Sequence, residues 1–162
     1  MLDFNKKNIF HYLFQLEKKV SWLSNFIIHH ANNIRNKEDD LKVGGHQASC
    51  ASITTIMVLL YFKIINEFDR IAVKPHASPV YHAIQYLLGN QTLDNLKNFR
   101  KLSGAQAYPS ITKDFPAVDF STGSVGLGGA MTIFSSINQD FLTANNLLDP
   151  RNESKMISIF GD

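Results

Sequence analysis

A chain of 162 residues with 44% hydrophobic and 19% charged residues has the composition of a globular protein that can bury a core of its own. Its net charge of +2 is small and its basic residues are scattered, which excludes the clustered positive surface typical of nucleic-acid binding.

Two features bear on the compartment in which the protein works. The single cysteine, Cys50, cannot form an internal disulfide, which favours a reducing environment. The charged N-terminus does not resemble a signal peptide, and the longest apolar stretch, residues 53–62, is too short to cross a bilayer. We therefore expect a cytoplasmic protein without a membrane partner.

The first half of the chain predicts two helices and a strand. Apolar residues at helical spacing predict an amphipathic helix with a basic outer face over residues 8–31, followed by a polar loop over 32–42. The run 48–68 is apolar nearly all round, which predicts a buried helix. Residues 70–73 predict a short buried strand, which Pro75 ends.

The second half predicts more helices and a final strand. Ser78 is expected to cap a helix that Gly89 ends, and Thr92 to cap another. The long loop 103–121 is expected to be functional or disordered. A glycine-rich turn then precedes a helix over 130–142 and a strand over 156–160. The order predicts an α/β domain with a parallel sheet flanked by helices, whose ligands bind at the carboxyl ends of the strands.

Histidines supply the first candidate groups for chemistry. His46 follows two glycines and precedes a helix, and His76 follows a strand and a proline, so each either faces a cleft or satisfies a local backbone group. His82 either faces the same cleft or packs in the core, and His29 and His30 suit the end of a helix, where the helix dipole favours a cation. A zinc site is a distant alternative, because the chain lacks a cysteine pair and the usual histidine spacings.

The glycine-rich segment 121–129 precedes a helix N-terminus, where backbone N–H groups bind phosphate well. It matches neither the P-loop nor the dinucleotide-binding spacing. Asp162 follows an apolar strand, which is a suitable position for a Mg²⁺ ligand.

Five motifs in order resemble the N-terminal cofactor domain of transketolases, and more closely the homodimeric bacterial kind of pyruvate dehydrogenase first component. They are residues 45–49 (GHQAS), 74–79 (KPHASP), 107–109 (AYP), 121–128 (STGSVGLG) and 159–162 (IFGD). The resemblance covers about residues 41–162, which suggests a division into an N-terminal helix and loop, 1–40, and an incomplete thiamine-diphosphate-binding domain, 41–162.

The resemblance implies thiamine diphosphate bound through Mg²⁺. It places His46 and His76 beside the reactive ring of the cofactor, with Tyr108 as a further active-site residue. It also implies cofactor contacts from Ser49, Gly123, Ser124 and Val125, and makes Asp162 the first metal ligand. The implied substrate is a 2-oxo acid or, for transketolase, a ketose phosphate.

The other metal ligands and the second domain of the family lie outside this sequence. We therefore expect poor cofactor binding and no turnover by this chain alone, and a partner that is either a second copy or a complementing C-terminal fragment. Ketol transfer by a transketolase is one alternative function. A truncated, non-catalytic paralogue that pairs with a complete subunit through helices such as 8–31 and 48–66 is another.

Overall fold

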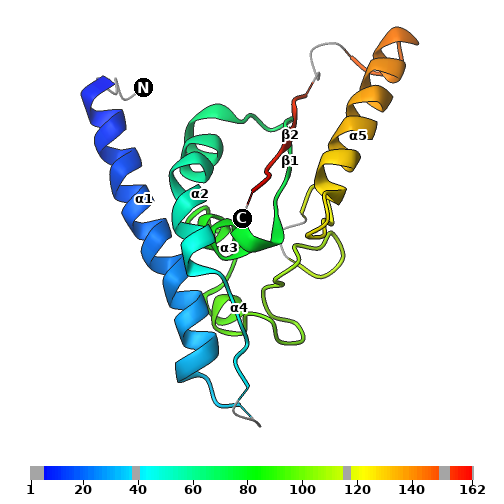
Figure 1. Ribbon diagram of the computed structural model, residues 1–162. Coiled ribbons are helices and arrows are strands. Elements are labelled where there is room, and N and C mark those ends of the chain that lie inside the picture. The colour runs from blue at the N-terminus through cyan, green and yellow to red at the C-terminus, as the bar shows by residue number, and fades with distance from the viewer. Residues whose placement is uncertain (1–5, 38–40, 115–117, 150–153, 162) are drawn as a thin grey trace.

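The computed structural model describes residues 6–37, 41–114, 118–149 and 154–161. Its elements, in chain order, are α1 (Lys6–His29), η1 (His30–Ile34), α2 (Gln47–Leu59), η2 (Leu60–Ile64), β1 (Arg70–Ala72), η3 (Pro75–Ala77), α3 (Ser78–Leu87), α4 (Leu93–Lys97), α5 (Leu127–Ala144) and β2 (Met156–Ser158). Figure 1 shows the helices α1 to α4 on one side of the two strands and α5 on the other.

The two strands form a parallel sheet, as the sequence predicted. β1 pairs with β2 in a register that places Arg70 opposite Met156 and Ala72 opposite Ser158. Ile159 N–H extends the ladder by donating to the carbonyl of Ala72 at 3.1 Å. On the other edge of β1, the Asp119 carboxylate accepts the N–H of Ile71 at 3.0 Å, so a side chain satisfies a backbone group that a further strand would otherwise pair.

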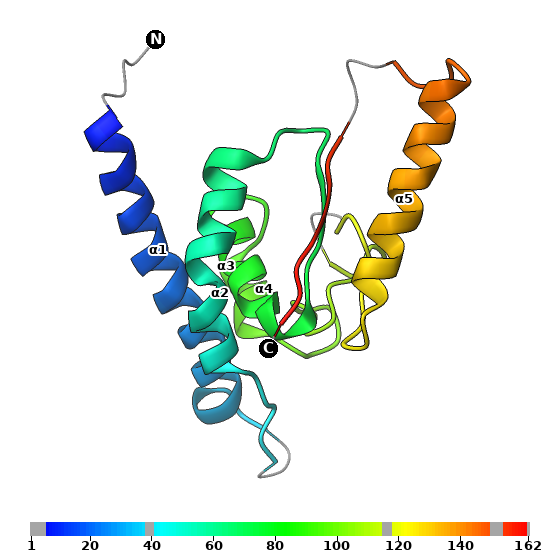
Figure 2. The ribbon, with the colours of Figure 1, turned by 45° about the horizontal axis from the view of Figure 1, so that its top comes forward.

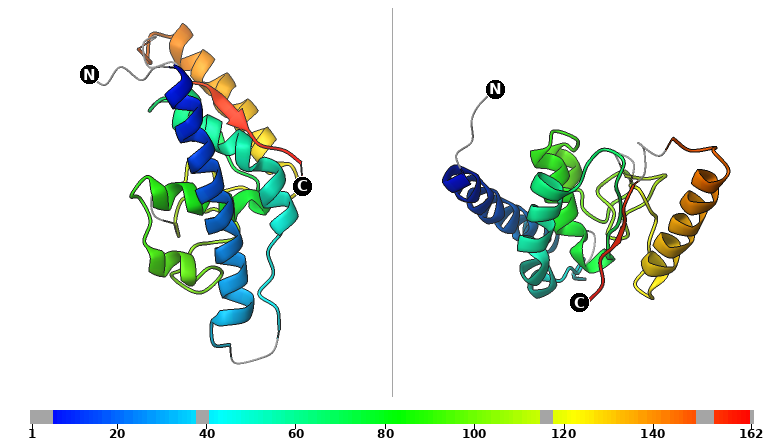
Figure 3. Two further views of the ribbon diagram at one scale, coloured as in Figure 1. Left: turned by 90° about the vertical axis from the view of Figure 1, so that its left-hand side faces the viewer. Right: turned by 90° about the horizontal axis from the view of Figure 1, so that it is seen from above.

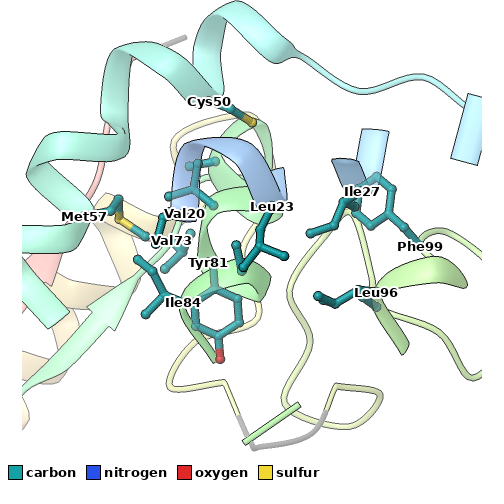
Figure 4. Close-up of a cluster of buried hydrophobic side chains, with 14 of the residues drawn as sticks. Val20, Leu23, Ile27, Cys50, Met57, Val73, Tyr81, Ile84, Leu96 and Phe99 are labelled. Atoms are coloured by element: carbon teal, nitrogen blue, oxygen red, sulfur yellow. The ribbon is translucent and has the colours of Figure 1, made fainter. Parts of the chain in front are cut away.

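The predicted first helix is confirmed as α1 and its continuation η1, a single π-helical turn. Val20, Leu23 and Ile27 recur at intervals of three and four residues and are buried. They meet Met57 of α2 and Ile84 of α3 in one apolar cluster, drawn in Figure 4. The amphipathic pattern of α1 thus packs it against the helices that cover the sheet.

The expected burial of the second helix is wrong. The helix spans α2 and η2, ends at Ile64 rather than 68, and buries only the side Cys50, Thr54, Met57 and Val58. The reason is that α2 packs against α1 and α3 with one side only, beside which Figure 2 shows it. No element among the described residues covers its opposite side.

By length and mean hydropathy alone, one helical segment in the described part of the chain could cross a membrane. This segment is Gln47–Ile64, with a mean hydropathy of 1.4. Such a helix is weak evidence, because the core helices of proteins that do not span membranes meet the same criteria. The expected cytoplasmic location therefore stays a prediction.

Three helix starts were predicted with different success. Thr92 caps α4 as expected, since its Oγ1 accepts the N–H of Asn95 at 3.2 Å. Ser78 does not cap α3: the 3₁₀ turn η3 precedes the helix, Ala77 takes the capping position, and Ser78 is buried. The helix predicted over 130–142 begins earlier, at Leu127. Gly126, which directly precedes it, has a left-handed conformation (φ 81°) that glycine adopts readily.

α5 packs against the sheet with one face and leaves the other uncovered by described residues. The right-hand view of Figure 3 shows α5 and α1 on opposite sides of the strands. Ile133, Phe134, Ile137 and Phe141 are each more than half exposed. α5 therefore presents an apolar face that no described residue covers.

Candidate functional site

The carboxyl ends of β1 and β2 meet at one edge of the sheet because the strands are parallel. The glycine-rich segment is held at this edge by a buried hydrogen bond, in which Thr122 Oγ1 donates to the carbonyl of Val73 at 2.6 Å. A segment that is distant in the sequence therefore lies directly beside the end of β1.

The two candidate imidazoles converge at the same edge, as predicted. The ring centroids of His46 and His76 lie 4.6 Å apart, with their planes at 61°. His46 stands immediately before α2, and His76 lies in η3, so a helix start and a strand end bring them together. Cys50 Sγ, one turn into α2, donates to the carbonyl of His76 at 3.5 Å and links the two elements.

Two hollows open at this edge and share part of their walls. We call the first the glycine-lined hollow, bounded by Lys74, Thr122, Gly123, Ser124, Gly126 and Phe160. The second, the histidine hollow, is bounded by Ser49, Lys74, His76, Phe160 and Gly161. Each has a volume of about 70 Å³, which is well below the roughly 300–1,000 Å³ that encloses a drug-sized ligand. Each hollow has room for a part of such a molecule.

The described residues around the glycine-lined hollow supply positive charge. Lys74 is the cationic side chain of its wall, and no carboxylate stands among the described residues that bound it. The N-terminus of α5 lies there with neither a side-chain cap nor an acidic residue in its first turn. The partial positive charge of a helix N-terminus therefore adds to that of the ammonium group.

The sequence of the chain is similar to those of several known proteins. No family model matches the chain. It is 31% identical over 139 residues to the pyruvate dehydrogenase E1 component of Haemophilus influenzae and, over the same length, 31% identical to that of Escherichia coli K12. Each alignment covers 80% of this chain. The transketolase-like protein 2 of Mus musculus is 32% identical over 95 residues, 52% of the chain. The similarity supports a thiamine-diphosphate-dependent family.

The chain spans 16% of the length of the Haemophilus protein and 15% of the length of the Escherichia coli and mouse proteins. The activity, substrates and partners of such whole enzymes are accordingly matters for proposal here.

The glycine-rich segment fits a phosphate-bearing cofactor of this family in part. A Cβ added at Gly123 or Gly126 would meet no atom within 4 Å, so these two glycines border open space. A Cβ added at Gly129 would instead collide with the ring of Phe160, so this glycine serves the packing of α5 on the strand end. The front of the segment is thus free to receive a ligand, while its rear is fixed by packing.

Only some of the remaining predicted site residues border one of the two hollows. Ser49 borders the histidine hollow, and Gly123 and Ser124 border the glycine-lined hollow. Val125 is 88% exposed and Tyr108 is 54% exposed, and neither bounds a hollow at this edge. Asp162 lies outside the described residues. The roles of all these residues, and of Mg²⁺, stay predictions.

His82, which the sequence left undecided, packs in the core. Its side chain is fully buried, its Nδ1 accepts from Gln91 Nε2 at 2.7 Å, and its Nε2 donates to the carbonyl of Gln106 at 2.7 Å. Burial lowers the pKa of His82, although Asp114, 3.9 Å from Nε2, acts in the opposite direction. A neutral imidazole therefore ties α3 to the loop over residues 103–114.

No group of three His, Cys, Asp or Glu side chains within the described ranges is arranged to hold a metal ion. Sequence reasoning missed Lys74 and Thr122. Both belonged to motifs that had been noticed, and the signal for Lys74 was its position directly after a strand in a sheet whose carboxyl edge was already expected to bind ligands.

Proposed function

We propose that this chain forms the thiamine-diphosphate-facing N-terminal part of an enzyme that acts on a 2-oxo acid, as a pyruvate dehydrogenase first component does. The observation that carries the proposal is the contact of the His46 and His76 rings, 4.6 Å apart, at the carboxyl edge of a parallel sheet. His76 bounds the histidine hollow there, which shares part of its wall with the glycine-lined hollow. The similarity to pyruvate dehydrogenase E1 components over 80% of the chain supports the substrate class.

In this proposal the residues of the chain bind and orient the reactants and move protons. Bound thiamine diphosphate would supply the carbanion and the electron sink. The backbone of Gly123 and Ser124 would hold its diphosphate, with Asp162 as a Mg²⁺ ligand. His46 and His76, whose imidazoles can both donate and accept a proton near neutral pH, would exchange a proton with the carbonyl oxygen of the substrate. Ser49 would border the same space.

A direct test is titration of the chain with thiamine diphosphate and Mg²⁺ while the imidazole resonances are followed by NMR. We expect the signals of His46 and His76 to shift together and those of His11, which is exposed on α1, to stay unchanged. His46→Ala and His76→Ala should alter the shifts of the remaining ring, and His11→Ala is the matched control. Because the chain alone is expected to bind the cofactor poorly, the titration extends to millimolar thiamine diphosphate. No shift at that concentration, or binding that leaves both rings unperturbed, would contradict the proposal.

Ketol transfer between sugar phosphates is the second candidate, because the mouse transketolase-like protein is similar over about half of the chain. Turnover assays of the chain, alone and with a complementing C-terminal fragment, separate the two. Release of CO₂ from pyruvate supports the first function, and two-carbon transfer from a ketose phosphate supports the second. A chain that binds the cofactor yet supports neither reaction in either form would favour the non-catalytic paralogue.

A further inference from the structure

A further hollow lies between α4 and the loop that follows this helix. We call it the loop hollow, and residues 91, 95, 100–106 and 112–114 form its wall. Its volume of about 580 Å³ falls within the roughly 300–1,000 Å³ that encloses a small-molecule ligand. It shares no residue with the glycine-lined hollow or the histidine hollow. The proposed cofactor site therefore does not account for it.

The wall of the loop hollow carries more positive than negative charge. Its three cations and one carboxylate, which give a net charge of +2, are Arg100, Lys101, Lys113 and Asp114. Arg100 is already engaged, because its Nη1 donates to the carbonyl of Val43. Lys101 and Lys113 are exposed, and their ammonium groups have no hydrogen bond or ion pair with any described residue. Two ammonium groups are thus free to meet one anion.

The carboxylate of Asp114 does not pair with these ammonium groups. Its side chain is 1% exposed, and its two oxygens accept the backbone N–H groups of Gln106 and Ser110 at 2.9 and 2.8 Å. The carboxylate therefore fixes the shape of the loop from the inside, and the lysines keep their charge for a ligand.

An unpaired amide oxygen belongs to the same wall. Gln91 is 7% exposed, and its Nε2 donates to Nδ1 of His82 at 2.7 Å, which fixes the orientation of the amide. Its Oε1 is buried and accepts no hydrogen bond from a described residue. Because an unpaired buried acceptor costs free energy, this position favours a ligand that brings an O–H or N–H donor. The side-chain amide of Asn95, also in the wall, likewise makes no hydrogen bond to a described residue.

We propose that the loop hollow binds a small phosphate monoester that carries hydroxyl groups. A phosphate monoester has a charge of about −1.5 to −2 at neutral pH, which suits the two free ammonium groups of Lys101 and Lys113. The hydroxyl groups would bond to the amides of Gln91 and Asn95. No aromatic side chain stands among the described residues of the wall, which disfavours a nucleotide base as the rest of the ligand. The inference does not depend on the proposed function.

The test is an NMR titration of the full chain with glycerol 2-phosphate, a phosphate monoester with two hydroxyl groups. We expect shifts of the backbone amides of residues 102–106. Lys101→Gln and Lys113→Gln should each weaken the affinity about tenfold, which is the effect of losing one charge-assisted contact. Lys63→Gln, which removes an exposed lysine from η2, is the matched control and should change nothing.

Inorganic phosphate separates the contribution of the lysines from that of the amides. It keeps the ammonium contacts and lacks the carbon-bound hydroxyl groups, so the wild type should bind it about tenfold more weakly than glycerol 2-phosphate. Asn95→Ala should reduce this difference and leave the affinity for inorganic phosphate unchanged. Glycerol alone should cause no shift.

Four results would overturn the inference. The first two are the absence of amide shifts at millimolar glycerol 2-phosphate and an affinity that neither lysine substitution lowers. Equal affinities for glycerol 2-phosphate and inorganic phosphate would mean an adventitious ion only. Shifts confined to residues 35–37 and 41–43 would place the anion in the neighbouring hollow that Lys101 also borders. Because thiamine diphosphate is the probe of the histidine pair, failure of either proposal leaves the other standing.

Discussion

At the amino end of the β1–β2 sheet, the Asp69 carboxylate accepts hydrogen bonds from the backbone. At the carboxyl end, in contrast, two hollows open beside the strand ends. Asp69 accepts the N–H of Lys155 at 2.8 Å and that of Asn66 at 3.0 Å, and its side chain is buried. These backbone hydrogen bonds, with the positive charge of Lys155 nearby, lower the pKa of Asp69 despite the opposing effect of desolvation. The amino end therefore holds the strands together, and the carboxyl end is left open.

The largest effect on stability is expected at the amino end. Asp69→Ala leaves two partly buried backbone N–H groups without their acceptor and should lower the free energy of unfolding by about 3 kcal/mol. Urea denaturation followed by circular dichroism measures the change. Glu67→Ala, at an exposed neighbouring position, should stay within about 0.5 kcal/mol. Equal effects of the two substitutions would mean that Asp69 does not close this end of the sheet.

A second substitution tests whether the carboxyl end tolerates every added side chain. Gly45 has a φ of 128°, and a Cβ there would lie 2.8 Å from Cγ1 of the buried Ile28. Gly45→Ala should cost about 2 kcal/mol through backbone strain and overpacking, and should displace the neighbouring His46. Gly123→Ala adds a methyl group in open space and is the control. Thermal unfolding of the two variants compares them, and a Gly45→Ala protein as stable as Gly123→Ala contradicts the prediction.

A third measurement, the pH dependence of stability, concerns the core beneath α3 rather than either end of the sheet. Because the pKa of His82 is lowered in the folded protein, the unfolded chain binds a proton first as the pH falls below its ordinary value of 6.5. His82 thus contributes a loss of stability below pH 6.5, by at most about 1.4 kcal/mol per pH unit. The groups that face the ring are Asp114, Gln91, Gln106, Tyr81 and Phe99.

Urea unfolding at pH 7.5 and at pH 5.5 measures this dependence. His82→Gln should flatten it, whereas His11→Gln, on the exposed side of α1, should leave it unchanged. A dependence that survives in His82→Gln would assign the proton uptake to another group.

The smallest effect on stability is expected for a residue to which we assign a central role in function. His46 is exposed, and its side chain makes no capping hydrogen bond to α2. His46→Ala should therefore change the free energy of unfolding by less than about 0.5 kcal/mol. The same variant should lose the response of the His76 ring to thiamine diphosphate. A large loss of stability in His46→Ala would remove the contrast between the two ends.

Local patterns predicted most of the elements. The spacing of Val20, Leu23 and Ile27 located α1, and Thr92 marked the start of α4, because helix periodicity and capping depend on residues close together in the sequence. The convergence of His46 and His76 followed from placing both at the ligand-binding edge of a parallel sheet. Burial of α2 was misjudged, since it depends on which elements cover a helix rather than on its own composition.

The site was only partly accessible to such reasoning. Lys74 stands out only because Gly123 and Gly126 bound the same hollow. The hydrogen bond between Thr122 and Val73 holds the glycine-rich segment beside the end of β1. His82 could not be assigned because its partners lie on two loops, Gln91 before α4 and Gln106 and Asp114 after it. Contacts of this kind follow from the tertiary structure and leave no periodic trace in the sequence.

The contact of Cys50 with the His76 carbonyl has a practical consequence. The thiol is completely buried, and burial raises its pKa to about 12, so hardly any thiolate exists at neutral pH. Alkylating reagents should therefore reach this sole cysteine only during the moments when α2 separates from η3. The rate of labelling would report how often the histidine pair comes apart, with no need for an introduced probe.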